Sequence, residues 1–289
     1  IASPTATWQD GKKYHIKSYA TDEATNKEVV VSSNTFIIDV TTPTSGITQP
    51  LNNSRVNSLD FIRGTASDTP PGETEIVEIS IYDRIDKKYY KNGSFSETSW
   101  YFFAAASTDS FHTWYSTSPT WVPGIDYSIW CRATDKAGNQ EVVVSSHTFV
   151  YDTEEPTSII TYPTDWLVVS EPTGSNLTIE GTASADCKPL IEGGVAVSVR
   201  RLSDGNYWQG LDFTNPSEDW RTPDGDLTSW TLDITKDKLN SGTTYFIHSK
   251  ATDLAGNVEG GGSGNAGLTF LYDKTEPSSG VVRSTVNSK

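Results

Sequence analysis

The sequence contains no methionine, only two cysteines and no run of some twenty apolar residues. Such a run is what a membrane-spanning helix needs, so we expect no membrane insertion in this segment. Basic residues number 22 against 37 acidic ones, and the resulting net charge of −15 argues against nucleic-acid binding. Because there is neither an initiator methionine nor a signal-peptide pattern, we expect a mature or excised piece of a longer protein.

Motifs that carry catalysis are also scarce. The sequence has no His-Glu-x-x-His, no Gly-x-Ser-x-Gly and no glycine-rich phosphate loop that opens a helix. Its histidines stand apart from one another: His15, His112, His147 and His248. Carboxylates are numerous, so a glycosidase pair remains open, but none occupies a setting that would obviously raise its pKa. We therefore predict that the protein is not an enzyme.

One stretch of the sequence occurs three times without internal gaps. Each copy is centred on a tyrosine, with an apolar residue six positions before it. These pairs are Trp8 and Tyr14, Trp121 and Tyr127, and Leu239 and Tyr245. Isoleucine, a small residue and alanine follow at two, four and six positions after the tyrosine. This period of two places the side chains on one face of a strand, and the recurrence is typical of a repeat protein.

The spacing within each copy identifies the strand. An apolar residue, a glycine turn and then a tyrosine are what a tyrosine corner requires, in which the hydroxyl bonds back to the crossing backbone. A tyrosine corner marks strand F of an immunoglobulin-like sandwich. The alternative is an ordinary edge hairpin that recurs. No segment shows the apolar spacing of a helix, so we predict an all-β fold of tandem immunoglobulin-like or fibronectin-III-like sandwiches.

Proline-bearing linkers divide the chain, because proline removes a ladder donor and ends a sheet. They end at Pro43, Pro156 and Pro277. The predicted domains are residues 1–42 (strands E to G of a partial domain), 43–155 and 156–276 (complete domains), and 277–289 (the first strand of a further domain). Cys131 lies where antibody-type domains keep their strand F cysteine, but the expected strand B has none. We therefore predict a small buried residue and no bridge.

Two elements together resemble a known family. The motif Ala-Thr-Asp-x-Ala-Gly-Asn, followed by Phe-x-x-Asp-x-x-x-Pro, is similar to the bacterial immunoglobulin-like (Big-type) repeats of large surface adhesins and related extracellular fibrous proteins. The matching residues are 133–139 with 149–156, and 251–257 with 270–277. The first copy departs from the pattern, with Thr25 in place of glycine.

The resemblance implies an extracellular, cell-surface location and a structural or adhesive role as a stalk, adhesin shaft or filament. Its implied partners are neighbouring immunoglobulin-like domains, other copies of the chain, and a cell-surface glycan or protein. In such repeats calcium at the linkers stiffens the array, so the resemblance also implies Ca²⁺ at the domain junctions.

The sequence supplies oxygen ligands for that metal, because the B–C loop, the F–G loop and the linker meet at one pole of a sandwich. The first junction offers Asp39, Asp68, Asp135 and Asn139. The second offers Asp152, Glu154, Asp186, Asp253 and Asn257. The alternative is that the aspartate and asparagine of each F–G hairpin simply bond their own backbone, with the linker acids solvated.

Tryptophan is the other open question. The repeat assigns Trp8 and Trp121 to the corner and therefore to a core. It does not assign Trp100, Trp130, Trp166, Trp208 and Trp220. Exposed and grouped, they would form a stacking platform for sugars, whereas buried or scattered tryptophans would fill the sandwich cores. The alternative function is therefore a carbohydrate-binding or accessory module of a secreted polysaccharide-active enzyme.

Overall fold

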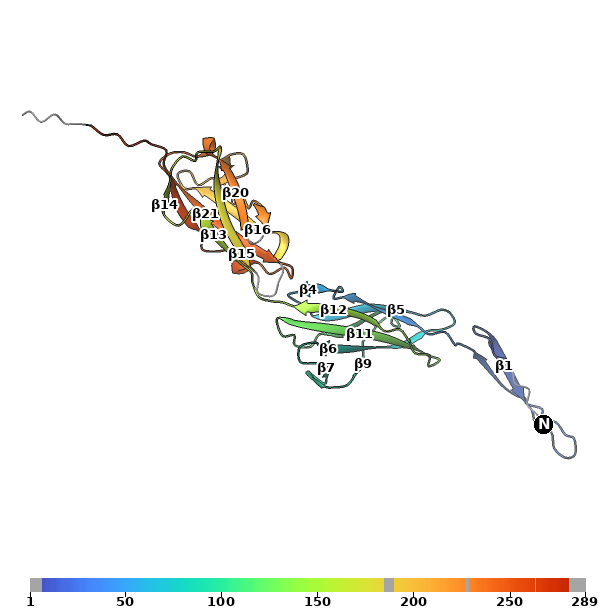
Figure 1. Ribbon diagram of the computed structural model, residues 1–289. Helices are drawn as coiled ribbons and strands as arrows, with labels where there is room; N and C mark the ends of the chain where they lie inside the picture. Colours follow the sequence, from blue (N-terminus) through green and yellow to red (C-terminus); the bar gives the residue numbers. More distant parts are fainter. Residues whose placement is uncertain (1–6, 185–189, 227–228, 263, 281–289) are drawn as a thin grey trace, which may run out of the picture. The chain divides into compact units, whose positions relative to one another are not determined.

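A computed structural model describes residues 7–184, 190–226, 229–262 and 264–280. The described residues form β-strands joined by loops, with 3-10 turns at Lys236–Lys238 (η1) and Glu259–Gly262 (η2). The chain divides into two compact units, residues 1–153 (unit 1) and 154–289 (unit 2) (Figure 1). Among the described residues, no helix is long and apolar enough to cross a membrane.

Unit 1 begins with an antiparallel hairpin of β1 (Lys13–Ser18) and β2 (Ser32–Ile37). A sandwich follows. Its smaller sheet has the order β10-β5-β3, from β3 (Thr44–Gln49), β5 (Phe61–Ser67) and β10 (Thr113–Thr117). Its larger sheet has the order β4-β12-β11-β6-β7-β8, and β9 (Phe103–Ala104) also pairs with β6. These strands are β4 (Ser54–Val56), β6 (Thr74–Asp83), β7 (Lys88–Lys91), β8 (Ser94–Glu97), β11 (Ile125–Asp135) and β12 (Ser145–Tyr151).

Unit 2 repeats this arrangement with its own strands. One sheet has the order β13-β15-β20-β19, from β13 (Thr157–Tyr162), β15 (Asn176–Ser184), β19 (Asp224–Asp226) and β20 (Ser229–Thr235). The other has the order β14-β22-β21-β16-β17-β18. Its strands are β14 (Leu167–Val169), β16 (Leu190–Arg201), β17 (Tyr207–Trp208), β18 (Phe213–Asn215), β21 (Thr243–Asp253) and β22 (Leu268–Tyr272).

Alternation along the strands builds each core. On β6 the residues Val77, Ile79 and Ile81 are fully buried, while the residues between them lie on the outward face. Cys131 is buried in the same core, and burial raises the pKa of its thiol to about 11. In unit 2 the equivalent residues of β16 are Val195, Val197 and Val199, all buried.

A glycine opposite a tryptophan closes each core. Gly64 on β5 pairs with Trp114 on β10, and a Cβ on Gly64 would overlap the indole ring. Gly181 on β15 pairs with Trp230 on β20 in the same way. Only glycine leaves room for these buried rings, so the same packing solution occurs in both units. Paired sheets, a buried core and a parallel edge strand beside strand G confirm the predicted immunoglobulin-like fold.

The three tyrosine-centred hairpins share one geometry. In each, the tyrosine hydroxyl accepts a hydrogen bond from a backbone N–H five residues earlier. The pairs are Tyr14 with Gln9 (3.0 Å), Tyr127 with Val122 (3.0 Å) and Tyr245 with Asn240 (2.8 Å). Each tyrosine also pairs across the hairpin with a phenylalanine, namely Phe36, Phe149 or Phe270.

The hairpin β1–β2 differs from the other two in exposure. Trp8 packs edge-on against Tyr14 at 4.8 Å, as Trp121 packs against Tyr127 at 4.8 Å. Yet Trp8, which we expected in a core, is 47% exposed, whereas Trp121 and the equivalent Leu239 are buried. Within the described part of the chain no second sheet covers this hairpin, so the corner forms without a sandwich around it.

In each sandwich, a glutamate fourteen residues after the tyrosine joins the hairpin to the first strand (strand A, which is β3 or β13). Glu141 accepts hydrogen bonds from the Ser45 backbone (3.0 Å), the Ser45 hydroxyl (2.6 Å) and the Ala133 backbone (3.0 Å). Glu259 makes the same three contacts, with Ser158 and Ala251. These glutamates therefore connect the two sheets of each sandwich through one carboxylate.

Candidate metal centre

Three aspartates from separate segments of unit 1 converge on one point. Asp39 follows β2, Asp68 follows β5 and Asp135 ends β11. One carboxylate oxygen of each lies within 4.8 Å of the others. Asp135 is fully buried, and the other two are half-buried. The linker, the loop after β5 and the β11–β12 hairpin thus meet at these three aspartates.

Asp135 is held by its own hairpin. Its Oδ1 accepts hydrogen bonds from the backbone N–H of Ala137 (2.9 Å) and Asn139 (2.8 Å), and its Oδ2 accepts one from the Asn139 amide (2.8 Å). Burial acts to raise the pKa of Asp135, but the hydrogen bonds from Asn139, Ala137 and Gly138 outweigh it and lower the pKa below its ordinary value. Asp135 is therefore an ionised carboxylate at neutral pH.

Asp39 is fixed by the linker and connected to the hairpin. Its Oδ1 accepts hydrogen bonds from the backbone N–H (3.2 Å) and the hydroxyl (2.9 Å) of Thr41. The Asn139 amide also donates to the Asp39 carbonyl oxygen at 3.2 Å. These contacts leave the Oδ2 of Asp39 directed at Gly72, where an added Cβ would lie 2.9 Å away.

Asp68 is the carboxylate with an unsatisfied oxygen. Its Oδ1 accepts a hydrogen bond from the Thr69 backbone at 2.7 Å, whereas its buried Oδ2 has no hydrogen-bond donor among the described residues. Burial raises the pKa of Asp68, and the negative charges of Asp39, Asp135 and Asp10 raise it further. An unpaired, buried carboxylate oxygen is costly unless a cation or a proton satisfies it.

Gly72 makes this approach of carboxylates possible. A Cβ at this position would overlap the Oδ2 of Asp68 and crowd the Oδ2 of Asp39. Glycine therefore allows both oxygens to face one small space. Neither Gly72 nor Asp10 stood out in the sequence, because neither belongs to the repeated motif.

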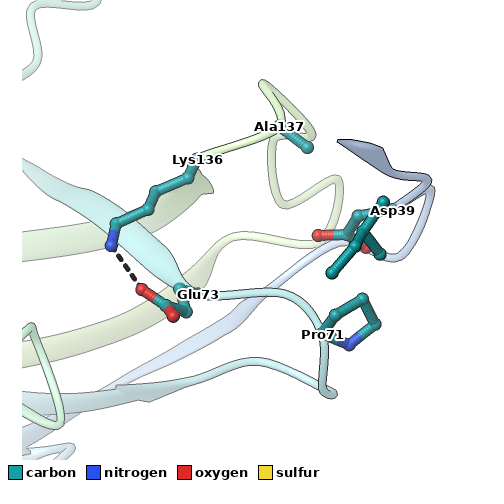
Figure 2. Close-up of a pocket in the computed structure, with 6 residues that line it drawn as sticks. Asp39, Pro71, Glu73, Lys136 and Ala137 are labelled. Atoms are coloured by element: carbon teal, nitrogen blue, oxygen red, sulfur yellow. Dashed lines mark hydrogen bonds and ion pairs between the residues drawn. The ribbon is translucent and has the colours of Figure 1, made fainter. Parts of the chain in front are cut away.

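Lys136, which lines the same pocket as Asp39, pairs with a different carboxylate. Figure 2 shows the side chain of Lys136 extending toward Glu73, with which it forms an ion pair, and away from Asp39 across the pocket that these residues line. Among the described residues, no lysine or arginine forms an ion pair with Asp39, Asp68 or Asp135. Their mutual repulsion is left uncompensated by the described side chains.

The donor set is one that a hard divalent cation prefers. It contains carboxylate oxygens and no nitrogen or sulfur atom, which fits Ca²⁺ or Mg²⁺ better than zinc. Ca²⁺ takes six to eight oxygen ligands in flexible geometry. The orphaned Asp68 oxygen and the space beside Gly72 fit such an ion, which Asp39, Asp68 and Asp135 would hold.

The other predicted ligands belong to the second junction. Asp152 is buried and lies 4.0 Å from Arg55 in a salt bridge. Asp253 and Asn257 repeat the hairpin contacts of Asp135 and Asn139, at 2.8 Å for both the backbone and the amide hydrogen bond. Glu154 is exposed, and Asp186 lies outside the described residues. Both hairpins thus have the backbone bonds that the alternative interpretation predicted, and in unit 1 the carboxylates also converge.

Comparison with known proteins gives no family. No protein-family model matches the chain, and no curated protein matches it. Among solved structures, fibronectin(III)-like modules of CbhA from Clostridium thermocellum are similar, with 15% identity, coverage of 80% of this chain and 95% of that chain, and a TM-score of 0.38. Domains FN1–FN3 of chicken CNTN1 have 12% identity, coverage of 92% and 76%, and a TM-score of 0.35. At these values the similarity supports no inference about function.

Proposed function

We propose that the chain is a non-catalytic, extracellular array of immunoglobulin-like units that serves as a stalk, adhesin shaft or surface filament. Its partners would be neighbouring units of the same kind, other copies of the chain, or a cell-surface protein or glycan. The observation that carries this proposal is the threefold recurrence of one hairpin geometry, including register, tyrosine corner and glutamate. A protein built by repeating one rigid element is suited to setting distance rather than to shaping a single reaction centre.

The surroundings of the histidines support a non-catalytic role. His15 contacts the Thr35 hydroxyl at 2.9 Å, and His147 contacts the Pro50 carbonyl oxygen at 2.8 Å. His112 and His248 have comparable partners in the Asp109 carbonyl oxygen and Glu218. Each ring is thus engaged locally. Of the four, His15 contacts a hydroxyl, but no described contact gives it the carboxylate that would orient it as a catalytic base.

We further propose that Ca²⁺ at Asp39, Asp68 and Asp135 fastens the linker after the hairpin β1–β2 to the sandwich of unit 1. Asp39 belongs to the linker, whereas Asp68 and Asp135 belong to sandwich loops. A cation bound to all three carboxylates would hold these segments together. Separating the segments would break that shared coordination and leave the carboxylates without a counter-ion. The cation would also remove the repulsion that raises the pKa of Asp68.

Calorimetry of the whole chain in Ca²⁺ and in EDTA tests the metal proposal. A ligand that binds only the folded state stabilises it by about 2.7 kcal/mol at one hundred times its Kd. We expect Ca²⁺ to raise the unfolding temperature of unit 1, and Asp68→Asn to abolish most of this rise. Asp60→Asn is the matched control, because exposed Asp60 lies in the same unit outside the cluster. Equal unfolding temperatures in Ca²⁺ and EDTA would refute the metal proposal.

Single-molecule stretching of the whole chain tests the structural role. Each complete sandwich spans somewhat more than one hundred residues, from β3 to β12 or from β13 to β22. At roughly 3.6 Å per residue, we expect abrupt unfolding events that each release about 400 Å of chain. Gradual extension at low force, without such events, would contradict a load-bearing role even if calcium binds.

A further inference from the structure

The outward face of the larger sheet in unit 1 carries a cluster of aromatic rings. Tyr82 on β6, Tyr89 on β7 and Trp130 on β11 share this face. The loop before β9 lays Trp100 and Phe102 over them. Trp100 lies 4.6 Å from Trp130 and 5.3 Å from Tyr89, and its plane is within 8° of that of Phe102 (ring centroids 5.7 Å apart).

Trp100 packs against the other rings of the cluster on one side and is exposed to solvent on the other. Its indole is 55% exposed, although it packs against other aromatic rings. Ser80, which pairs with Trp130 on this outward face, is fully buried beneath the cluster. The cluster is therefore close-packed against the sheet, and Trp100 presents an indole whose orientation is already set before any ligand arrives.

A charged but neutralised pair borders the rings. The Arg132 guanidinium lies 3.9 Å from the Phe102 centroid and forms a salt bridge of 2.9 Å with Glu78. Both side chains remain partly exposed. A guanidinium and a carboxylate side by side offer several hydrogen-bond donors and acceptors without net charge, which suits vicinal hydroxyl groups.

Unit 2 keeps the framework of this face but not the indole platform. In unit 2, Val197 forms a β-bridge with Arg221, as Ile79 pairs with Phe103 in unit 1. Trp220, which precedes Arg221, therefore occupies the position of Phe102. Lys250 lies 4.0 Å from the Trp220 ring, as Arg132 does from Phe102. In place of the contact between Trp100 and Trp130, however, unit 2 has Glu218 at 3.4 Å from His248.

This difference shows that the fold does not require the exposed indole. The cation over a ring occurs in both units and is part of the shared architecture. In unit 1 the large apolar residue Trp100 is about half exposed to solvent, whereas unit 2 has the polar pair Glu218 and His248 in its place. Exposed, grouped aromatic rings beside satisfied polar groups are characteristic of a recognition surface.

We propose that the outward face of β6 and β11 binds a neutral, β-1,4-linked glycan, with one pyranose ring stacked on Trp100 and its hydroxyls bonded by Arg132 and Glu78. The apolar C–H face of an equatorially linked pyranose is flat and matches an indole. The net charge of −15 disfavours an acidic glycan, and the neutral Arg132–Glu78 pair favours hydroxyls over charged groups.

The site is testable by NMR of the indole N–H groups in the whole chain, titrated with cellohexaose, xylohexaose, β-1,4-mannohexaose and, as a curved α-linked comparison, maltohexaose. We expect at least one of the β-1,4-linked sugars to shift the Trp100 signal, which Trp100→Phe identifies by its loss. Maltohexaose should bind more weakly. Trp100→Ala should weaken binding at least about tenfold, and Trp100→Phe, which keeps a ring, should weaken it less.

Trp166→Ala is the matched control, because Trp166 is 76% exposed in unit 2 and outside the cluster. It should bind as the unaltered chain does. The proposal is wrong if none of the β-1,4-linked sugars binds, if maltohexaose binds equally well, or if Trp100→Ala retains full affinity. Arg132→Gln should weaken binding while leaving the Trp100 signal in place, and unchanged affinity there would overturn the role of the Arg132–Glu78 pair. None of these binding measurements depends on calcium.

Discussion

Glu141 and Ser45 are 96 residues apart in the chain, yet one carboxylate accepts hydrogen bonds from both the backbone and the hydroxyl of that serine. The same carboxylate accepts the backbone N–H of Ala133 on β11. Strand A of one sheet is therefore joined to strand F of the other by a side chain and not by a disulfide. The buried thiol of Cys131 lies beside this junction, with its Sγ 3.3 Å from the Ser45 hydroxyl oxygen.

Replacing Glu141 with glutamine should destabilise unit 1 by about 1–3 kcal/mol, because the amide nitrogen cannot accept the hydrogen bonds that the carboxylate accepts. In the hairpin β1–β2, the one hydrogen bond that the described residues give the Glu28 carboxylate comes from the Ala20 backbone N–H (2.9 Å), and Glu28 is exposed. Glu28→Gln should therefore have a much smaller effect. Calorimetry of the whole chain measures both, and equal effects would show that the contact with Ser45 contributes nothing.

The tyrosine corner permits a second matched comparison. Tyr127→Phe removes the acceptor of the Val122 N–H and should cost about 1 kcal/mol, because the Tyr127 side chain is buried and the hydrogen bond is partly shielded from water. Tyr14→Phe removes the equivalent bond to Gln9 in an exposed hairpin, where water replaces it. Urea denaturation followed by tryptophan fluorescence should show a lower midpoint for Tyr127→Phe only. A larger loss for Tyr14→Phe would contradict this reasoning.

We expect the loss of stability from a glycine-to-alanine substitution near Trp114 to depend strongly on which glycine is replaced. Gly64→Ala places a Cβ inside the indole ring and should destabilise unit 1 by about 1–3 kcal/mol, the usual cost of overpacking. Gly46 lies on the adjacent strand β3 with open space at its Cβ position. Gly46→Ala is therefore the control, and thermal unfolding should be nearly unchanged. Similar losses in both variants would indicate an effect of strand conformation instead of packing.

Asp68 should give unit 1 a pH-dependent loss of stability when calcium is removed. Burial and the neighbouring carboxylates hold the pKa of Asp68 above its ordinary value, so the folded state binds this proton more tightly than the unfolded chain does. This group's contribution is therefore present below the unfolded pKa, near 3.9, and is lost as pH rises through the raised folded pKa.

The difference between the unaltered chain and Asp68→Asn isolates this effect. In EDTA the unaltered chain should lose stability relative to the variant as pH rises from acid toward neutrality. The lowered pKa of Asp135 acts in the opposite direction and is present in both proteins. Denaturation curves at several pH values measure the difference, and a difference that does not vary with pH would refute the raised pKa.

The repeated tyrosine motif made the fold predictable. Period-two alternation and the corner spacing indicated strand F, and the structure has paired sheets around the buried Tyr127 and Tyr245. The glutamate was equally accessible, since Glu28, Glu141 and Glu259 keep a constant offset from the tyrosines. It was missed because its partner Ser45 is distant in the chain, and periodicity within a strand carries no information about contacts between sheets.

The candidate sites were predictable to different degrees. Loop positions in a sandwich were enough to group Asp39, Asp68 and Asp135, but the orphaned oxygen and the role of Gly72 depend on side-chain packing. Trp100 lies in an irregular segment with no periodicity, so its exposure was not predictable. The backbone conformation of Trp166 was not predictable from its residue type either. Its φ is 59°, close to the 58° of the equivalent Asn53, and asparagine adopts this left-handed conformation far more readily than tryptophan.

The hairpin β1–β2 keeps the register, the corner and the ring contacts of its counterparts without a second sheet. Nearly all of its contacts are close in sequence, whereas the pairing of β5 with β10 closes a long loop. Because local contacts tend to form before distant ones, we expect the tyrosine hairpin of each unit to form early in folding. In a chain that repeats the same hairpin, early nuclei of this kind would favour partners from the same repeat and reduce misassembly between neighbours during synthesis.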